Sequence, residues 1–212
     1  MSPIIFDASN FNWIRQLKFS ILSGDYNPIH IDREGARRVL IGVPIVHGMN
    51  LVLSLINQIT LPFDRPCLIS RISGEFLKPV PVGGKISAEI KVDGNGLRAF
   101  ISDRSSSRPS RAAIFDIEYQ STDEPRRIGP EFVRSERQER TPCEVDGNLN
   151  EAYQRGSLSL GVDATLLRRM FPMVLNKLSL EQTGSLLALS RLVGMRCPGQ
   201  NSLFSSFKVD FH

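Results

Sequence analysis

The sequence predicts an α+β fold in which one long buried helix is wrapped by an antiparallel β-sheet, followed by a partial second copy of the same unit. Three observations support this prediction: a strictly alternating strand pattern at 85–92, a mostly apolar helical stretch at 49–61, and a similarity between distant segments at a constant offset of 135 residues. With 212 residues, 41% of them hydrophobic, the chain has enough apolar mass for one or two cores.

The sheet is predicted from alternation and turn signals. Within 85–92, one face carries only apolar side chains: Ile86, Ala88, Ile90 and Val92. The tetrapeptide at 93–96, Asp-Gly-Asn-Gly, is a strong hairpin signal and leads into a strand at 97–103. A loop rich in Ser, Arg and Pro then precedes a strand at 112–119, and 67–76 supplies another strand. We therefore expect an antiparallel sheet of at least four strands.

The buried helix is predicted at 49–61. Its polar residues fall on one narrow stripe, and they are Asn50, Ser54, Asn57 and Gln58. Everything else in the segment that faces away from this stripe is apolar, so the helix is expected to be buried over most of its circumference.

The chain also repeats itself. Residues 67–76 align with 202–211 at an offset of 135, and the same offset aligns Leu51-Val52 with Leu186-Leu187. A duplication explains the agreement of a helix and a strand at one offset. The second copy stops at His212, where the first continues into its hairpin, so we expect either a shortened chain or another subunit that supplies the missing strands.

The predicted domain organisation follows from these patterns. Residues 1–120 form the first unit, 121–150 form a polar and charged linker, and 151–212 form the partial second unit. An unfinished sheet with an open edge favours association, so we expect a homodimer.

Composition excludes several classes of protein. No stretch approaches the roughly 18 to 20 consecutive apolar residues of a membrane span, and the first residues do not resemble a signal peptide. Three separated cysteines without CxxC spacing predict neither disulfides nor a metal site. The net charge of +4 is mild, and basic and aromatic residues do not interleave, so we expect no nucleic-acid partner. We expect a cytoplasmic protein that does not bind membranes.

The segment most informative about chemistry runs from Phe19 to His30. Gly24 and the Asn27-Pro28 pair force an irregular backbone, which presents Asp25 and His30 from a rigid loop. A carboxylate and an imidazole that converge can position a water molecule and move protons near neutral pH. The pair is therefore a candidate acid/base unit.

Gly48 lies at the predicted start of the buried helix. Unpaired backbone N–H groups and the positive end of the helix dipole point outward there, and they can stabilise negative charge that develops on a carbonyl oxygen. We interpret His47 as a structural residue at this helix start and assign the oxyanion role to the Gly48 amide.

These residues resemble the MaoC-like (R)-specific enoyl-CoA hydratase and dehydratase family of hot-dog folds. The family pattern is an aromatic residue, Ser-Gly-Asp-x-Asn-Pro-hydrophobic-His, and then a downstream His-Gly-Met. It is matched by Phe19, Ser23, Gly24, Asp25, Asn27, Pro28, Ile29 and His30, followed by His47, Gly48 and Met49. The resemblance extends over residues 10 to 120 and implies a hot-dog fold, in agreement with the periodicity.

The resemblance also implies a reaction, the reversible addition of water to a trans-2-enoyl thioester. Asp25 and His30 would handle the water and a proton, Asn27 would hold the loop or the water, and the Gly48 N–H would bind the thioester oxygen. No metal or other cofactor is implied, because coenzyme A or phosphopantetheine enters as part of the substrate. The expected partner is an acyl thioester of coenzyme A or of an acyl carrier protein.

Further substrate contacts are candidates only. Ser54 either faces the pocket or is a satisfied helix hydroxyl, and Arg33, Arg37 and Arg38 either meet phosphates or an acidic carrier or are solvated surface charges.

The second copy lacks the acid/base pair, because Leu160 and Thr165 stand 135 residues after Asp25 and His30. We therefore expect it to be non-catalytic. The alternative functions are a non-catalytic acyl-thioester-binding or assembly subunit and, more weakly, a thioesterase on the same fold.

Overall fold

The computed structural model describes residues 4–6, 11–38, 41–59, 67–121, 161–196, 199 and 203–211. The predicted linker at 121–150 lies outside these residues apart from its first position, which ends a strand. None of the helices in the described ranges is long and apolar enough to span a membrane.

The described strands form one six-stranded antiparallel sheet in the order β1-β3-β4-β5-β2-β6. Their bounds are β1 Ile4–Ile5, β2 Cys67–Phe76, β3 Ile86–Asp93, β4 Gly96–Asp103, β5 Ser110–Ser121 and β6 Ser206–Asp210. The hairpin predicted at 93–96 joins β3 to β4, since Asp93 pairs with Gly96. The expected sheet of at least four strands is confirmed.

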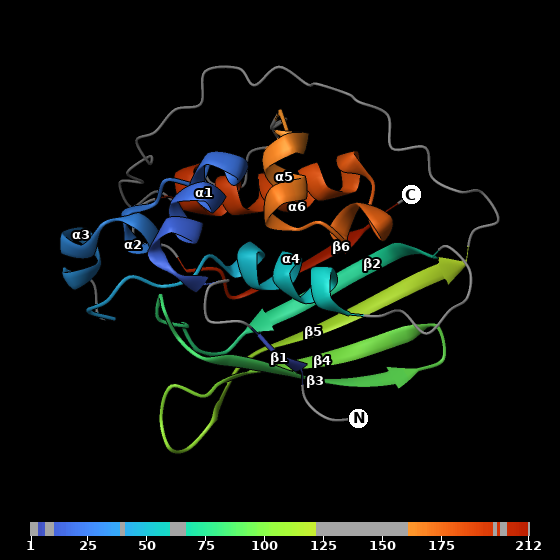
Figure 1. Ribbon diagram of the computed structural model, residues 1–212, viewed down its shortest axis with the longest axis horizontal. Helices are drawn as coiled ribbons and strands as arrows, with labels where there is room; N and C mark the ends of the chain where they lie inside the picture. Colours follow the sequence, from blue (N-terminus) through green and yellow to red (C-terminus); the bar gives the residue numbers. More distant parts are fainter. Residues whose placement is uncertain are drawn as a thin grey trace, which may run out of the picture.

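The buried helix is α4 (Gly48–Gln58), and all its residues from Met49 to Ile56 are buried. It ends three residues earlier than predicted, because Ile59 adopts an extended conformation (φ −62°, ψ 133°) while remaining buried. Figure 1 shows α4 lying along one face of the sheet, with further helices on its other side. This is the predicted α+β hot-dog architecture, a central helix wrapped by an antiparallel sheet.

The helices before α4 carry the loop of interest, and those after the sheet come from the second half of the chain. Before α4 lie α1 (Trp13–Ser23), α2 (Pro28–Ile31) and α3 (Arg33–Arg37). The second half contributes α5 (Ala164–Met170), the 3₁₀ helix η3 (Val174–Asn176), α6 (Leu180–Arg191) and the π-helical turn η4 (Leu192–Arg196). Helices α5 and α6 lie with α1 on the side of α4 away from the sheet (Figure 1).

The last strand, β6, joins the two halves by pairing with β2. Ser73 lies opposite Lys208, which follows it by 135 residues. Ile72 pairs with Val209 and Gly74 with Phe207, and the offset of 135 exchanges these two pairs. This register is the one expected when two copies of a unit pair through the same strand about a two-fold axis at Ser73.

A single hydrophobic core joins the halves. The rings of Phe19 on α1 and Phe171 after α5 meet edge to face with centroids 6.4 Å apart, and both are fully buried. The Lys177 ammonium donates a 2.6 Å hydrogen bond to the backbone oxygen of Ile56, in the last turn of α4. The second half thus packs on α4 and α1 as part of the same folded body.

Candidate active site

The loop between α1 and α2 is fixed by local backbone chemistry. Helix α1 ends at Gly24, which has a left-handed conformation (φ 71°) and whose N–H donates to the Ser20 oxygen. The Asn27 side chain then accepts from the Ile29 N–H at 3.2 Å and caps α2, whose first residue is Pro28. Asp25 is therefore held between two helix termini that the sequence specifies.

Asp25 is buried, with 2% of its surface exposed. Its Oδ1 accepts from the Asn27 N–H at 3.2 Å, and its Oδ2 accepts from the Ser190 hydroxyl at 2.7 Å. Burial raises the pKa of the Asp25 carboxyl, against the opposing effects of His30, the Ser190 hydroxyl and the Asn27 N–H. The carboxyl is thus poised nearer to neutrality than an exposed aspartate.

His30 lies in α2, and its orientation is fixed by the backbone. Its Nδ1 donates to the carbonyl oxygen of Ile45 at 2.9 Å, which leaves Nε2 with a free lone pair in the neutral ring. Burial lowers the pKa of His30, although the Asp25 charge and the Ile45 bond oppose this shift. The result is a neutral imidazole beside a carboxyl of raised pKa.

His47 supports this pair from behind. Its ring stacks on His30 with centroids 3.9 Å apart. Its Nδ1 lies 2.8 Å from Gln16 Oε1, and its Nε2 lies 3.3 Å from the Asp25 backbone oxygen. Burial and the neighbouring His30 hold the pKa of His47 well below its usual value. The interpretation of His47 as a packing residue is consistent with these contacts, although its side chain makes no capping bond to α4.

One ligand atom each from Asp25, His30 and His47 lie within 4.8 Å of one another, a spacing that a metal ion could bridge. Both ring nitrogens of His47 are already within hydrogen-bonding distance of protein oxygens, however, so a metal would have to displace these contacts. Two free donor atoms remain, one on Asp25 and one on His30. This set suits the handling of protons better than that of a metal.

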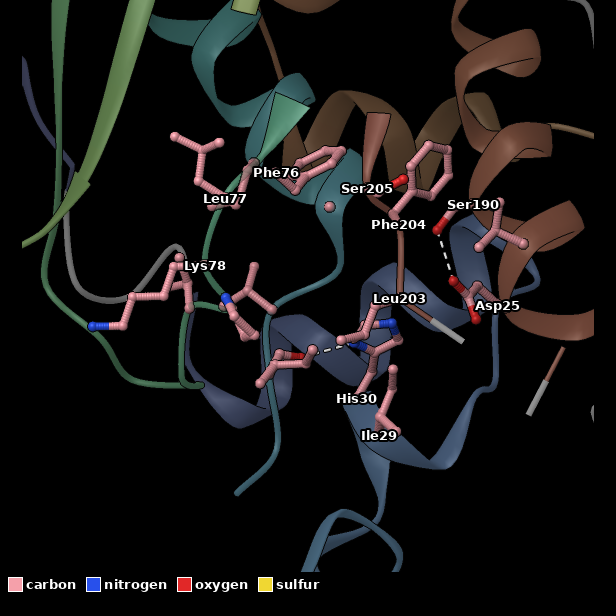
Figure 2. A pocket seen from close by; sticks show the side chains of 18 residues that line it. Asp25, Ile29, His30, Phe76, Leu77, Lys78, Ser190, Leu203, Phe204 and Ser205 are labelled. Carbon is pink, nitrogen blue, oxygen red and sulfur yellow. Dashed lines mark hydrogen bonds between the residues drawn. The ribbon is translucent and has the colours of Figure 1, made fainter. Parts of the chain in front are cut away.

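A cavity of about 250 Å³ opens beside the pair. Asp25, His30 and Gly48 line it together with apolar side chains, and Figure 2 shows Phe76 and Leu203 around the same space. Gly48 is the first residue of α4, so its amide has no intrahelical acceptor. A Cβ atom at Gly48 would lie 2.8 Å from the Phe76 ring. The cavity therefore brings an acid/base pair and a helix N-terminus to one apolar space.

The other predicted residues fall elsewhere. Asn27 is fully buried and shapes the loop, as its second contact, a 3.2 Å bond from Nδ2 to the Gly199 oxygen, shows. Ser54 does not line the cavity, because its hydroxyl points to Asn50 Oδ1 at 3.4 Å. Of the candidate basic residues, Arg33 lies over the Trp13 ring, and all three are exposed and outside the cavity lining: Arg33, Arg37 and Arg38.

Two site residues were not predicted from the sequence. Ser190 and Gly194 come from the second half and line the cavity next to Asp25 (Figure 2 shows Ser190 with its bond to Asp25). No local motif surrounds either residue, and 165 residues separate Ser190 from Asp25. The repeat offset alone offered a signal, since it placed a second helix near 183–193.

The fold and the site together define a hot-dog domain with a buried carboxyl–imidazole pair on an apolar cavity. Residues 15–105 match the family model described as MaoC like domain. The resemblance stated from the sequence is thus confirmed, and this segment of the chain is a MaoC-like domain.

One curated relative is the (R)-specific enoyl-CoA hydratase of Aeromonas caviae, which is 38% identical over 77 residues. The match spans 35% of this chain and about half of the relative, 56% of its length. Among solved structures, an (R)-hydratase from A. caviae involved in PHA biosynthesis is 25% identical, covers 57% of this chain and 93% of its own, and has a TM-score of 0.48. A protein from Archaeoglobus fulgidus is 19% identical, covers 57% and 76%, and has a TM-score of 0.44.

Proposed function

We propose that this chain is a hydro-lyase that catalyses the reversible hydration of trans-2-enoyl thioesters and the dehydration of (R)-3-hydroxyacyl thioesters. The observation that carries the proposal is the convergence of Asp25, His30 and the Gly48 helix terminus on one cavity. The named activity of the A. caviae relative supports it. The (R) stereochemistry is taken from that relative.

In this proposal Asp25 and His30 act as a coupled pair on one water molecule. As the water oxygen bonds to C3 of the enoyl group, the pair takes one proton from it and delivers one proton to C2, so that the pair returns to its starting state. The reverse sequence removes the C2 proton and expels water. The carboxyl of raised pKa and the neutral imidazole suit this exchange, because neither holds its proton strongly near pH 7.

The Gly48 amide has a separate role. Addition of water at C3 pushes negative charge through C2 onto the thioester oxygen, giving an enolate-like transition state. A free backbone N–H at the start of α4 stabilises that charge by hydrogen bonding and by the helix dipole. A larger residue at position 48 would meet Phe76, so the close approach of a ligand to this amide depends on glycine.

The reaction needs no redox cofactor, because water addition changes no net oxidation state, and we propose that no metal takes part. Coenzyme A or a phosphopantetheine carrier enters with the substrate. The apolar lining of the cavity suits the acyl chain.

The test follows the loss of enoyl absorbance of crotonyl-CoA and of a longer trans-2-enoyl-CoA. We expect the wild type to be active, and Asp25→Asn and His30→Ala to lose about 100-fold or more in kcat/KM. Asp116→Asn, on the outer face of the sheet and paired with Arg98, is the matched control and should keep full activity.

Wild-type protein that leaves both substrates unchanged would contradict the proposal, as would equal activity in all variants. Binding of an acyl thioester without turnover would favour the alternative of a non-catalytic binding subunit, for which the absence of the acid/base pair from the second half speaks. Release of free thiol would indicate a thioesterase.

A further inference from the structure

We propose that the second half of the chain completes the active site, with Ser190 as a positioning residue for the Asp25 carboxyl and Gly194 as the position that makes room for it. The inference rests on the proposed function for its kinetic consequences only. Both residues lie outside the segment, 15–105, that matches the MaoC-like family model.

The contact of Ser190 with Asp25 is short and enclosed. The Ser190 hydroxyl donates to Asp25 Oδ2 at 2.7 Å, and 3% of Ser190 and 2% of Asp25 are exposed. No water competes for a bond that is buried to this degree, so the hydroxyl fixes the orientation of the carboxyl group. It also stabilises the carboxylate over the carboxylic acid, because a hydroxyl donor binds the charged form more strongly.

The other serines of α6 allow a comparison within one helix. Ser185 is exposed, and its hydroxyl donates to the Glu181 backbone oxygen one turn earlier, a common way to satisfy a helix hydroxyl. Ser190 instead directs its hydroxyl across the interface to a titratable side chain. This difference separates a site contact from ordinary helix packing.

Gly194 lies in the π-helical turn that follows α6. A Cβ atom at this position would lie 2.1 Å from Asp25 Oδ1 and 2.5 Å from its carboxyl carbon, so only glycine fits against the carboxyl group. The π-helical turn shifts the backbone of residues 192–196 out of the α-helical path, a distortion that is frequent at functional sites. Helix α6 therefore approaches Asp25 twice, with a hydroxyl and with bare backbone.

The loop that carries Asp25 is tied to the same segment at two further points. The Tyr26 N–H donates to Met195 Sδ at 3.1 Å, and the Asn27 side chain donates to the Gly199 oxygen at 3.2 Å. Three consecutive residues, Asp25 to Asn27, thus find partners in the second half. The geometry of the loop depends on a segment far away in the sequence.

The repeat makes the assignment asymmetric. The position on α4 that corresponds to Ser190 is Leu55, which is fully buried. The second copy has no carboxylate or imidazole at the positions that correspond to Asp25 and His30. A hydroxyl is therefore present on the helix that meets a catalytic loop, and an apolar residue on the helix whose counterpart loop lacks one.

The decisive experiment measures the titration of Asp25 directly. Protein labelled with ¹³C at the aspartate carboxyl carbons is titrated by NMR, and the Asp25 signal is assigned by its absence in Asp25→Asn. Ser190→Ala should raise the pKa of Asp25, because the carboxylate loses a donor. Ser190→Thr keeps the hydroxyl and should restore the wild-type titration, and Ser185→Ala should not move it. An unchanged Asp25 titration in Ser190→Ala would overturn the proposal.

Kinetics then test the consequence for the proposed reaction. We expect Ser190→Ala to lower kcat/KM for the enoyl thioester by roughly 10- to 100-fold and to move the Asp25 limb of its pH profile to higher pH. A role confined to packing would lower activity, if at all, without moving the profile, and this result would contradict the inference. Should wild-type protein not turn over enoyl thioesters, the proposed function fails, and the carboxyl titration still decides the role of Ser190.

A second variant, Gly194→Ala, tests the close approach. Its added methyl group should displace the Asp25 carboxyl and shift its NMR signal, with circular dichroism to confirm that the protein remains folded. A folded Gly194→Ala protein with an unshifted Asp25 signal would count against the proposed packing.

Discussion

The two halves of the chain share an ancestral pattern but differ in what they contribute to the site. The first half supplies the loop with Asp25 and His30 and the helix terminus at Gly48. The second half has Leu160 and Thr165 where the pair would be, yet its helix α6 and the following turn pack against Asp25, Tyr26 and Asn27. A copy that has lost its own chemistry can thus remain part of the other copy's site.

The largest expected effect comes from breaking the contact between the halves. Phe171→Ala removes a fully buried ring that packs against Phe19 and under the Arg15 guanidinium. We expect a loss of about 3–5 kcal/mol of unfolding free energy, and a fall in Tm of about 10 °C. Met173→Ala, a few residues away and half exposed, is the control and should change Tm little.

Thermal unfolding of Phe171→Ala also tests whether the halves are energetically separate. Because one core includes both, calorimetry should show one transition, and activity should disappear together with the fold. Two resolved transitions would instead show that the second half melts independently.

A smaller and opposite effect is expected at the site itself. Burial raises the pKa of Asp25 in the folded protein, so its ionisation costs stability once the pH exceeds the unfolded pKa near 4. Asp25→Asn should therefore abolish activity and yet stabilise the fold at pH 7 by about 1 kcal/mol. Urea unfolding at pH 7 and below pH 4 measures this, and the gain should shrink at the acidic pH, where Asp25 is protonated in both states.

The interface contains a second buried ionisable group, Lys177. Its ammonium binds the Ile56 oxygen of α4, and burial lowers its pKa to about 8. Between pH 8 and about 10.5 the unfolded chain binds the proton that the folded protein has released, so stability from this group rises with pH across that window. Lys177→Met lacks this titration, so its unfolding free energy relative to the wild type should fall between pH 8 and 10.

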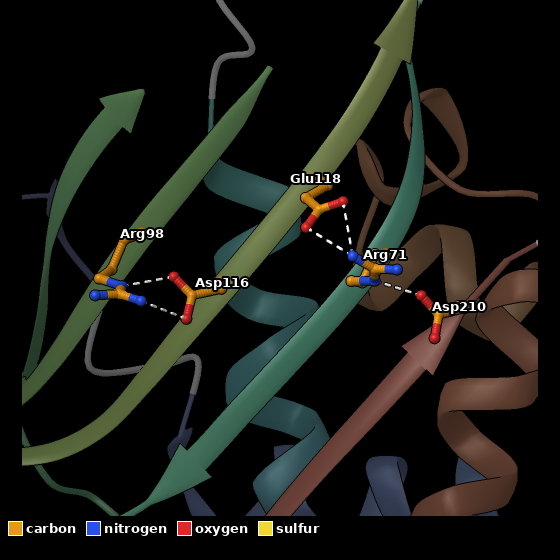
Figure 3. Close-up of polar contacts among 5 residues, drawn as sticks. All are labelled: Arg71, Arg98, Asp116, Glu118 and Asp210. Carbon is orange, nitrogen blue, oxygen red and sulfur yellow. Dashed lines mark hydrogen bonds and ion pairs between the residues drawn. The ribbon is translucent and has the colours of Figure 1, made fainter. Parts of the chain in front are cut away.

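The smallest effect is expected on the outer face of the sheet. Arg71 on β2 pairs with Glu118 on β5 and with Asp210 on β6, and so links the two halves, whereas Arg98 pairs with Asp116 within the first half (Figure 3). Both guanidinium groups are exposed, and exposed pairs contribute little. Arg71→Ala and Arg98→Ala should each lower Tm by an amount close to the error of measurement; a large fall in Arg71→Ala alone would show that the strand pairing depends on charge.

Local patterns predicted much of the fold from the sequence. Strand β2 falls at the predicted 67–76, and the loop with Asp25 and His30 is held by the cap residues that its sequence indicates. Helix α4 was predicted too long at its C-terminal end, since the apolar residues after Gln58 remain buried in a non-helical conformation. Periodicity reports burial, and it does not report where a backbone leaves the helix.

The contributions of the second half to the site could not be predicted. Ser190 is an ordinary serine on a helix, and Gly194 resembles any glycine after a helix end. Their roles arise from a tertiary contact with a loop 165 residues away, which no local pattern encodes. The homodimer predicted from an open sheet edge remains a prediction, although β6 covers the edge of β2 within the chain.

The placement of Ser190 on the same polypeptide as Asp25 has a consequence for dilution. A site assembled from two separate subunits loses activity when the protein concentration falls below their dissociation constant, whereas a tethered segment meets its loop at an effective concentration set by the chain. For this protein, specific activity should therefore be independent of enzyme concentration as far as the Ser190 contact is concerned, so the site can work at nanomolar levels without a neighbour to complete it.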